Sequence, residues 1–547
     1  MPARTWFWGG LTAVAVVAVG TAAIALRSSA GEAGAMATPR FVEEAAAAGI
    51  AHTYDGGFTF FVGGGVAVLD CDEDGRPDVY LAGGENPAGL YRNVASVGGE
   101  LAFDAVHGPE TALTGVTGAY PIDIDGDGPT DLAVLRLGEN ILLRGIGDCR
   151  FERANEGWGF DGGDVWTTAF SATWEADAEL PTLAIGNYVA VDAAGLQTGG
   201  CVDNALVRPE GAEYGAPELL APGWCSLSML FSDWSRSGRA DLRVANDRQY
   251  YRDGQEQLWR IDAGDPPSLY ASDEGWKDLK IFGMGIASYD VTGDGRPEVF
   301  LTSMGDNKLQ TLEDGGEQPS YRDIALDLGV TAHRPFLGDQ TMPSTAWHAE
   351  FQDVNNDGYI DLYVTKGNVD AMVEAATEDP SNLLLGQADG TFAESAEAAG
   401  IVNLARGRGA ALADFNLDGM LDVIEVNRGE PAKLWRSVGW GLGPEPAAMG
   451  DWLALRLAQP AGNRDAVGAW IEVRAGSQTM QREVTVGGGH GSGQLGWIHF
   501  GLGDADSAQV RVQWPGGEVG PWLDVEPGRF FTIEQEGGAT VWDPSGA

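Results

Sequence analysis

Short apolar runs alternate with Asp/Gly-rich loops along most of the chain, and one phrase of this pattern recurs. An apolar run leads into an Asp/Gly-rich loop, a second apolar run follows, and a hydrophobic pair with Arg often closes the phrase. Residues 172–188 keep the same apolar–acidic–apolar frame but have lost the regular acidic spacing. The pattern therefore predicts seven units of about 55–60 residues. Residues 172–188 belong to the third unit, and the loops of the six other units begin at Asp70, Asp123, Asp233, Asp290, Asp353 and Asp414.

Each unit contains four runs of strand length, and the last of them carries a signature of its own. It begins with an aromatic residue and ends at a glycine before an apolar residue, as in residues 321–330 and 392–401. Four strands in a radially repeated unit are typical of a β-propeller blade. The signature also precedes the first loop, at residues 41–50, whereas the last unit lacks its own copy. We therefore expect the N-terminal strand to complete the last blade and close a seven-bladed β-propeller.

A different pattern follows the repeats. Apolar and polar positions alternate within residues 450–540, for example at Trp452, Leu453 and Leu455, and glycine-rich turns separate the runs. This alternation predicts a small antiparallel β domain. The fold class is thus mostly β, with an N-terminal helix over residues 1–30, a propeller over 38–440, the β domain over 449–540 and a tail over 541–547.

Composition narrows the range of partners. The chain has 80 acidic and 34 basic residues, which gives a formal net charge of −46. A surface of this sign repels nucleic acids and anionic lipid headgroups, so we expect neither as a partner.

The N-terminus carries an export signal. Arg4 precedes an uncharged stretch of 21 residues, Trp6 to Leu26, which ends at Arg27. At ~1.5 Å per residue this stretch is long enough to cross the ~30 Å hydrocarbon core of a membrane. We expect a retained helix that anchors an exported bacterial protein to the inner membrane, with the large domain in the periplasm or on the outer surface. Small residues after Arg27 leave cleavage and secretion as the alternative.

The acidic loops have the spacing of a metal site. They follow D-x-[DNST]-x-[DS]-G-x-x-[DE], which places side-chain oxygens at positions 1, 3, 5 and 9 and glycine at position 6. A ring of oxygens suits Ca²⁺, and the crowding of carboxylates favours a metal over turns that merely join strands. The loop of Asp233, Ser235, Ser237 and Asp241 has two carboxylates and should bind weakly or not at all. We expect about four to five closed, stabilising Ca²⁺ sites, at Asp70, Asp72, Asp74, Asp78, Asp123, Asp125, Asp127, Asp131, Asp290, Thr292, Asp294, Glu298, Asp353, Asn355, Asp357, Asp361, Asp414, Asn416, Asp418 and Asp422.

Four cysteines form an even set without C-x-x-C spacing, which in an exported protein permits two disulfides in any of three pairings. Cys201 and Cys225 flank a Pro/Gly-rich stretch, and Cys71 and Cys149 fall in loops at the same end of neighbouring blades. These placements favour Cys201–Cys225 and Cys71–Cys149. Residues 192–228 interrupt the regular spacing, so we interpret them as a long loop and a candidate partner surface.

The quoted residues carry a family resemblance. The repeat resembles the FG-GAP/VCBS repeats of integrin-α-like propellers, and the run HFGLG…VQWPGG within residues 499–517 resembles the ASPIC/UnbV domain. The combination is similar to bacterial relatives of the cartilage acidic protein family over about residues 41–540. The resemblance implies a secreted or surface calcium-binding propeller. The degenerate third unit, the weak loop at Asp233 and the long uncharged N-terminus depart from that pattern.

Catalytic motifs are weak by comparison. Residues 491–496 match G-x-G-x-x-G, but a β-like run follows them instead of a helix, so a plain glycine turn is the better interpretation. The leading hypothesis is a non-enzymatic calcium-binding scaffold that binds other proteins, one version being an accessory subunit of a membrane complex. A surface adhesion or carbohydrate-binding protein is the alternative from fold analogy, and a propeller enzyme is a third.

Overall fold

The computed structural model describes residues 38–176, 178–192, 195–247, 254–313, 315–440, 449–460 and 462–546. The predicted N-terminal membrane helix, residues 1–30, lies outside this part of the chain. Within the described residues, no helix combines the length and the apolar character that a membrane span needs. Strands make up most of the regular structure described, which confirms the predicted mostly β class.

The first repeat shows how the pattern folds. Its strands β2 (Val66–Leu69), β3 (Asp78–Leu81), β4 (Gly89–Asn93) and β5 (Phe103–Val106) pair as antiparallel neighbours in sequence order. β2 and β3 are buried along their whole length, as their continuous apolar runs predict. The acidic loop connects these two strands.

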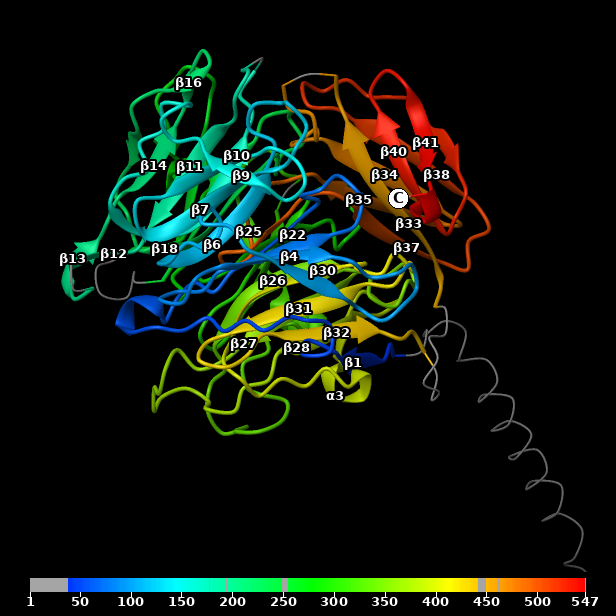
Figure 1. The fold of residues 1–547 in the computed structure, drawn as a ribbon, viewed down its shortest axis with the longest axis horizontal. Helices are drawn as coiled ribbons and strands as arrows, with labels where there is room; N and C mark the ends of the chain where they lie inside the picture. Colours follow the sequence, from blue (N-terminus) through cyan, green and yellow to red (C-terminus); the bar gives the residue numbers. More distant parts are fainter. Residues whose placement is uncertain are drawn as a thin grey trace, which may run out of the picture. The chain divides into compact units, whose positions relative to one another are not determined.

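The same antiparallel order recurs in further groups of four strands, which follow from cyan to yellow in Figure 1. The next groups are β6 (Val116–Ile122), β7 (Asp131–Gly138), β8 (Ile141–Gly145) and β9 (Phe151–Arg153), then β10 (Val165–Thr173), β11 (Thr182–Asn187), β14 (Asn204–Val207) and β17 (Glu218–Leu220), then β18 (Ser226–Ser232), β19 (Asp241–Asn246), β20 (Gln257–Arg260) and β21 (Ser268–Leu269). The later groups are β22 (Ile286–Tyr289), β23 (Glu298–Leu301), β24 (Lys308–Leu312) and β25 (Tyr321–Asp323), then β26 (Ala346–Gln352), β27 (Asp361–Lys366), β28 (Asn382–Gly386) and β29 (Phe392–Glu394), then β30 (Gly407–Ala413), β31 (Asp422–Asn427) and β32 (Lys433–Ser437). This repetition is propeller-like.

The last of these groups takes its fourth strand from the N-terminal end of the described chain. β1 (Phe41–Glu43) pairs antiparallel with β32, with Phe41 opposite Ser437. The buried Arg436 guanidinium lies 2.8 Å from the Glu44 carboxylate and adds an ion pair to this junction. The expectation that the N-terminal strand completes the last group is confirmed.

In two of the groups, the signature ends in a helical turn closed by glycine. β25 leads into α2 (Ala325–Leu328) and β29 into α3 (Ala396–Ala399). Gly329 and Gly400, which end these turns, have φ of 81° and 76°, a left-handed conformation that favours glycine. Short 3-10 turns add η1 (Phe58–Phe60), η3 (Ser272–Glu274) and η4 (Pro544–Gly546).

Residues 192–228 are not the irregular loop that their spacing predicted. They contain β14 and β17, the third and fourth strands of their group, and the start of β18. Two small hairpins account for the altered spacing, because they insert extra residues between the strands. These hairpins are β12 (Val189–Val191) with β13 (Gln197–Cys201), and β15 (Pro209–Glu210) with β16 (Glu213–Tyr214).

The C-terminal region forms two four-stranded sheets. One has the order β37-β33-β40-β41 and the other β35-β34-β38-β39. The strand pairs of these sheets are antiparallel, as predicted, with one exception: β33 and β40 pair in parallel. Alternation of apolar and polar residues predicts strands but carries no information on the direction of a partner about 75 residues away. The strands are β33 (Asp451–Ala458), β34 (Trp470–Ala475), β35 (Gln478–Glu483), β37 (Ile498–Gly503), β38 (Ala508–Gln513), β39 (Leu523–Val525), β40 (Arg529–Glu534) and β41 (Gly538–Trp542), the last extending two residues beyond the predicted boundary at 540.

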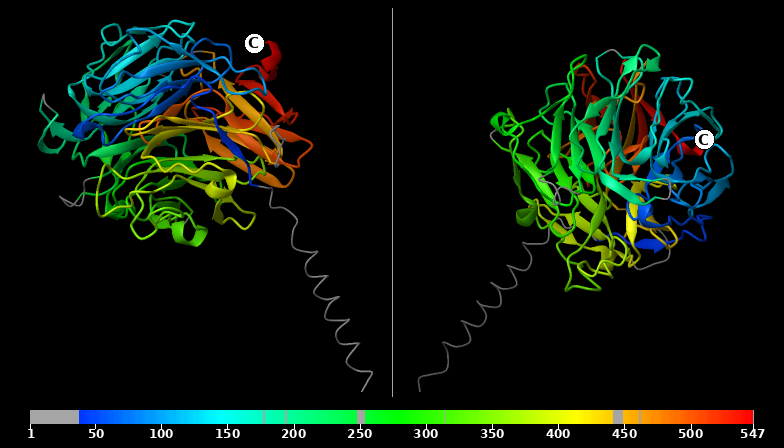
Figure 2. Two further views of the ribbon diagram at one scale, coloured as in Figure 1. Left: turned by 60° about the horizontal axis from the view of Figure 1, so that its bottom comes forward. Right: turned by 90° about the vertical axis from the view of Figure 1, so that its left-hand side faces the viewer.

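One segment of this region, residues 484–496, enters the propeller-like part of the chain; we call it the central segment. It contains β36 (Gly493–Gln494), which pairs in parallel with β2 and places the orange C-terminal strands beside the blue first group in Figure 2. Backbone bonds join Val486 to Ala172 of β10, Gly488 to Met229 of β18, Gly489 to Ile286 of β22, and Gly491 to Ala119 of β6. His490 accompanies them with a bond from its N–H to Nδ1 of His348 on β26, at 3.1 Å.

The central segment thus contacts the first strand of group after group. A Cβ atom at Gly409 of β30 would lie 2.5 Å from Oγ of Ser492, so this strand also passes close to the segment. Residues 38–547 form one compact unit, and the predicted division at residue 449 separates two parts that interpenetrate. The G-x-G-x-x-G match belongs to this segment, whose glycines permit close backbone approach.

Candidate functional site

The predicted acidic loops share one backbone geometry. In the first loop, both carboxylate oxygens of Asp70 accept backbone hydrogen bonds, from Asp74 at 3.0 Å and from Gly75 at 2.9 Å. Gly75 has a φ of 83°, which explains the glycine at position 6. The same pair of bonds recurs at Asp233, Asp290, Asp353 and Asp414. The first aspartate of each of these loops therefore closes the loop through backbone hydrogen bonds.

The ninth position has a structural role that the sequence did not reveal. The buried Asp78 accepts a bond from the N–H of Cys71 at 2.8 Å and another from the N–H of Asn93, at the end of β4, at 2.7 Å. Its carboxylate therefore links the loop to the third strand of the group. The only sign of this structural role in the sequence was the recurrence of Asp at position 9. Equivalent pairs of bonds are made by Asp131, Asp361 and Asp422.

The first two loops fit a cation. Ligand oxygens of Asp70, Asp72 and Asp78 lie within 4.8 Å of one another, as do those of Asp123, Asp125 and Asp127. Oδ1 of Asp72 and Oδ1 of Asp123 are buried and accept no hydrogen bond, so each has a lone pair available to a ligand.

The electrostatics of these two loops point the same way. Burial, together with neighbouring carboxylates, raises the pKa of Asp70 to about 6 and that of Asp123 to about 7. A divalent cation would offset both the cost of burying these charges and the repulsion between them. Arginines supply part of that relief, with Arg76 at 2.7 Å from Asp74 and Arg144 at 3.0 Å from Asp125.

The loops at Asp353 and Asp414 also retain oxygen donors. Burial and a nearby carboxylate raise the pKa of both residues well above the usual range. Asn355 and Asn416 donate their amide N–H to Asp357 and Asp418. Oδ1 of Asn355 accepts from the N–H of Asp357 at 3.2 Å, whereas Oδ1 of Asn416 is buried without a donor. Both loops therefore keep a donor set that suits Ca²⁺.

The loops at Asp290 and Asp233 are less suited to a metal. Glu298 accepts bonds from the N–H groups of Val291 and Thr292 and from the hydroxyls of Thr292 and Thr311, so two predicted ligands already satisfy each other. In the other loop, the carboxylate of Asp241 is occupied by Trp234, Tyr270, Ile261 and Arg239. Weak or absent binding at this loop remains a prediction.

The C-terminal sheets rest on the acidic loops. Nε1 of Trp497 donates to the carbonyl of Gly75 at 2.8 Å, and the ring of His499 lies 2.6 Å from the amide oxygen of Asn356. A Cβ atom at Gly419 would lie 1.9 Å from Nε1 of Trp452. A change in loop geometry would therefore alter contacts with the C-terminal sheets. The separate sequence patterns of the two parts did not reveal this contact.

A cavity of about 520 Å³ lies between the loops and these sheets. Its lining includes Asp70, Asp123 and Asp414, the first residues of three acidic loops, together with Arg456 and Asp465 from the C-terminal region. Three of the metal-ligand candidates thus line a cavity at the interface between the loops and the C-terminal sheets.

Both favoured disulfides are present. Cys71 and Cys149 join neighbouring groups with their Cα atoms 4.5 Å apart, and Cys201 and Cys225 are joined with a Cα separation of 4.8 Å. Disulfides persist in oxidising compartments. They indicate an extracellular or exported domain.

Comparison with known proteins identifies both parts of the chain. The model of the FG-GAP-like repeat matches residues 70–134 and 353–424, and the model named ASPIC and UnbV matches residues 459–540. Cartilage acidic protein 1 of Xenopus tropicalis is 23% identical over 496 residues, which cover 83% of this chain and 70% of that protein. The mouse protein of the same name is 27% identical over 164 residues, which cover 28% of this chain and only 22% of its own length.

Solved structures give weaker similarities. One describes specific recognition of non-reducing terminal N-acetylglucosamine by an Agrocybe aegerita lectin, with 16% identity, 68% of this chain and 93% of that chain covered, and a TM-score of 0.37. The Dos1 propeller has 9% identity, with 76% of this chain and 97% of that chain covered, and a TM-score of 0.35. Scores of this size do not transfer a function. The chain therefore carries FG-GAP-like repeats followed by an ASPIC and UnbV domain, and it has weak homology to cartilage acidic protein 1.

Proposed function

We propose that this chain is an exported, calcium-stabilised, seven-bladed propeller that binds other proteins and does not catalyse a reaction. The observation that carries the proposal is the recurrence of one acidic loop between the first two strands of successive groups, with buried oxygens of Asp72, Asp123 and Asn416 that accept no hydrogen bond. A count of seven blades takes β1 with β30, β31 and β32, and it divides the eight-stranded sheet, in which β7 pairs with β10, into two groups.

Calcium would be held by loop residues alone. In the first loop the ligands are Asp70, Asp72, Asp74 and Asp78, and the loops at Asp123, Asp353 and Asp414 offer equivalent sets. The ion supplies positive charge that neutralises crowded carboxylates and fixes the loops beneath the C-terminal sheets. Such closed sites favour stabilisation over catalysis, because no coordination position needs to face a substrate.

The calcium proposal is tested by titrating metal-free protein with Ca²⁺ in a calorimeter and by measuring Tm in EDTA and in millimolar CaCl₂. We expect saturable binding of several ions and a Tm that rises with Ca²⁺, because a ligand of the native state stabilises it. Mg²⁺ at the same concentration is the control, and equal Tm values in all three buffers would contradict the proposal.

A binding role at the outer face of a membrane fits the two disulfides and the uncharged stretch at residues 6–26. Solubilising native membranes in mild detergent, followed by native gel electrophoresis and mass spectrometry, tests this part. A stoichiometric complex that contains residues 1–30 supports an anchored subunit. Recovery of the protein alone, starting near residue 31, would overturn the anchored version in favour of a secreted one.

A further inference from the structure

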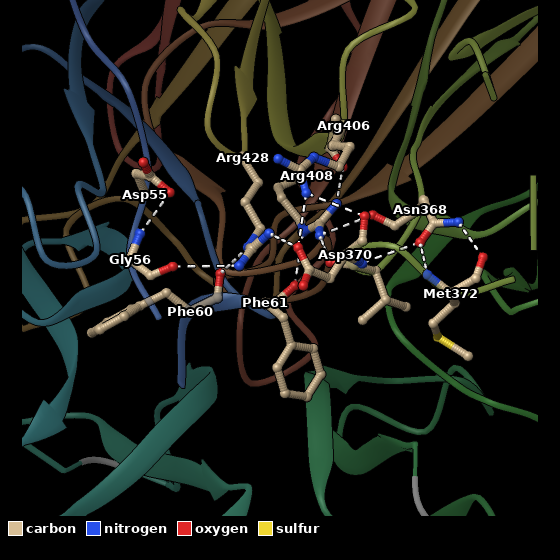
Figure 3. Close-up of polar contacts among 12 residues, drawn as sticks. Asp55, Gly56, Phe60, Phe61, Asn368, Asp370, Met372, Arg406, Arg408 and Arg428 are labelled. Carbon is tan, nitrogen blue, oxygen red and sulfur yellow. Dashed lines mark hydrogen bonds and ion pairs between the residues drawn. The ribbon is translucent and has the colours of Figure 1, made fainter. Parts of the chain in front are cut away.

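Three arginines converge at the strand ends that lie away from the acidic loops (Figure 3). Arg406 and Arg408 stand at the beginning of β30, whose other end leads into the loop at Asp414. Arg428 follows the end of β31, whose first residue, Asp422, belongs to that same loop. Strands of six or seven residues separate the two ends by about 20 Å, so this cluster is distinct from the metal-ligand candidates.

The guanidinium of Arg408 is a buried charge without a counterion among the residues that the structure describes. It is fully buried, and its Nε donates to the carbonyl of Phe61 at 2.9 Å. Further bonds go to the carbonyls of Gly407, Asn368 and Val369, and the group stacks 4.1 Å from the ring of Trp347. Carbonyl dipoles solvate this charge but do not cancel it.

The two other arginines share one carboxylate. Nη1 of Arg428 lies 2.6 Å from Oδ1 of Asp370, and Nη1 of Arg406 lies 2.9 Å from the same oxygen. The side chain of Asp370 is 62% exposed, whereas Arg428 is 8% exposed and is fixed by the carbonyls of Phe60 and Gly56. Arg428 is thus held by the fold, Arg406 also donates to the backbone carbonyl of Asp370 at 3.2 Å, and the Asp370 carboxylate projects into solvent.

Two guanidinium groups contact the carboxylate of Asp370, and that of Arg408 lies beside them. Two further carboxylates lie at the edge of the cluster, but both accept backbone N–H groups there: Asp55 from Gly56, and Glu85 from Gly57 at 2.9 Å. Among the described residues, Asp370 is therefore the one carboxylate in contact with these arginines.

Exposed apolar side chains belong to the same loops. Leu404, two residues before Arg406, is 46% exposed, and Val373, three residues after Asp370, is 81% exposed. Phe58, in the 3-10 turn whose Phe60 accepts from Arg428, is 49% exposed. A ligand that pairs with the arginines would therefore have apolar surface within reach.

We propose that Arg406 and Arg428 bind the carboxylate of an organic acid with an apolar part, and that Asp370 occupies this position when the ligand is absent. The acid is either a free small molecule or an acidic side chain of a partner, since both present the same planar group to the arginines. Ligand binding displaces the exposed Asp370 carboxylate and leaves Arg408 in place behind it.

The test uses the full chain, saturated with Ca²⁺, and two pairs of probes in calorimetric titrations. Benzoate represents the free acid and benzamide is its neutral match. A doubly capped Leu-Asp-Leu peptide represents the side chain, and its Asn counterpart is the neutral match. We expect Asp370→Asn to bind the acidic member of at least one pair about tenfold more tightly than the unmodified protein, because the competing carboxylate is gone. The pair that responds identifies the source.

A second set of variants changes Arg406, the proposed partner of the acid. Adding Arg406→Gln to Asp370→Asn should abolish the gain, and Arg406→Lys should retain part of it, because lysine keeps the charge and loses the forked geometry. Binding should weaken as salt increases. The exposed pair Arg92–Asp104 provides the matched control, so Asp104→Asn should bind neither acid better than the unmodified protein does.

Equal binding of acidic and neutral probes would overturn the proposal, as would a failure of every variant to bind either acid. A gain from Asp104→Asn equal to that from Asp370→Asn would do the same. The calcium titration is independent of these results, because the cluster and the acidic loops share no residue. Loss of one activity with retention of the other therefore identifies which proposal fails.

Discussion

Gly65 lies where the chain enters β2 and passes the central segment. A Cβ atom here would lie 1.7 Å from the carbonyl oxygen of Gly491. We predict that Gly65→Ala lowers the free energy of unfolding by about 3 kcal/mol, because backbone atoms on both sides must move apart. Denaturant titration measures the change. Gly108→Ala is the matched control, since its Cβ would meet only the Thr111 hydroxyl at 3.6 Å, and an equal loss in both variants would contradict the explanation.

Substitutions at two aspartates of the first loop, Asp78 and Asp72, distinguish closure of the loop from metal binding. Each oxygen of Asp78 accepts one backbone N–H group. In Asp78→Asn the amide nitrogen replaces one of these oxygens and cannot accept, so one of the two bonds is lost. We predict that this variant loses about 2 kcal/mol of stability even in EDTA. Asp72→Asn should leave stability in EDTA unchanged and lower calcium affinity about tenfold, because Oδ1 of Asp72 has no protein donor. Unfolding and calcium titrations of both variants distinguish the two roles, and interchangeable behaviour would refute this division.

At the scale of the element, each acidic loop concentrates carboxylates that are difficult to ionise together. Burial raises the pKa of Asp70 to about 6, of Asp123 to about 7 and of Asp131 to about 8, with neighbouring carboxylates adding to the effect. Between the usual value near 4 and these values, the folded state binds more protons than the unfolded state. Without metal, stability is therefore greatest near the acidic end of this range and decreases as the pH rises toward 8.

This argument predicts opposite results with and without calcium. In EDTA, the urea midpoint should fall between pH 5.5 and pH 8.5. In CaCl₂ the fall should disappear or reverse, because the bound ion stabilises the ionised carboxylates and must compete with protons at the lower pH. A midpoint in EDTA that rises over the same range would show that repulsion among these carboxylates does not limit the metal-free protein.

The elements differ in how well the sequence predicted them. The first two strands of most groups were recognisable because an acidic loop of fixed spacing lies between two apolar runs. β14 and β17 were missed because one hairpin separates β14 from β11, another separates β17 from β14, and their short runs lack a recurring neighbour. The arginine cluster was also missed, since Arg406, Arg428 and Asp370 come from different loops and no local pattern links them.

At the scale of the whole molecule, the sequence predicted two domains in succession, and the structure joins them. The glycines of the central segment resembled a simple turn because their reason lies in backbone partners far away in the chain. Gly491 bonds to Ala119, and Ser492 accepts from the N–H of Val66. Periodicity along a single sequence does not contain such contacts. The pattern did predict the pairing of β1 with the last group. The last unit lacks a fourth-strand signature, and an extra copy of that signature precedes the first loop.

The interpenetration predicts that the whole described unit unfolds in one step. The central segment bonds to strands β2, β6, β10, β18, β22 and β26, so it cannot leave without breaking contacts in group after group. Calorimetry in CaCl₂ should therefore give one transition, and far-UV circular dichroism and tryptophan fluorescence should report the same midpoint. A chain that ends at residue 440 should lose at least 10 °C in Tm, about the shift that several lost kcal/mol produce in a protein of this size. Two separated transitions, or a truncated chain as stable as the full one, would show that the two parts fold independently and that the central segment only occupies space between them.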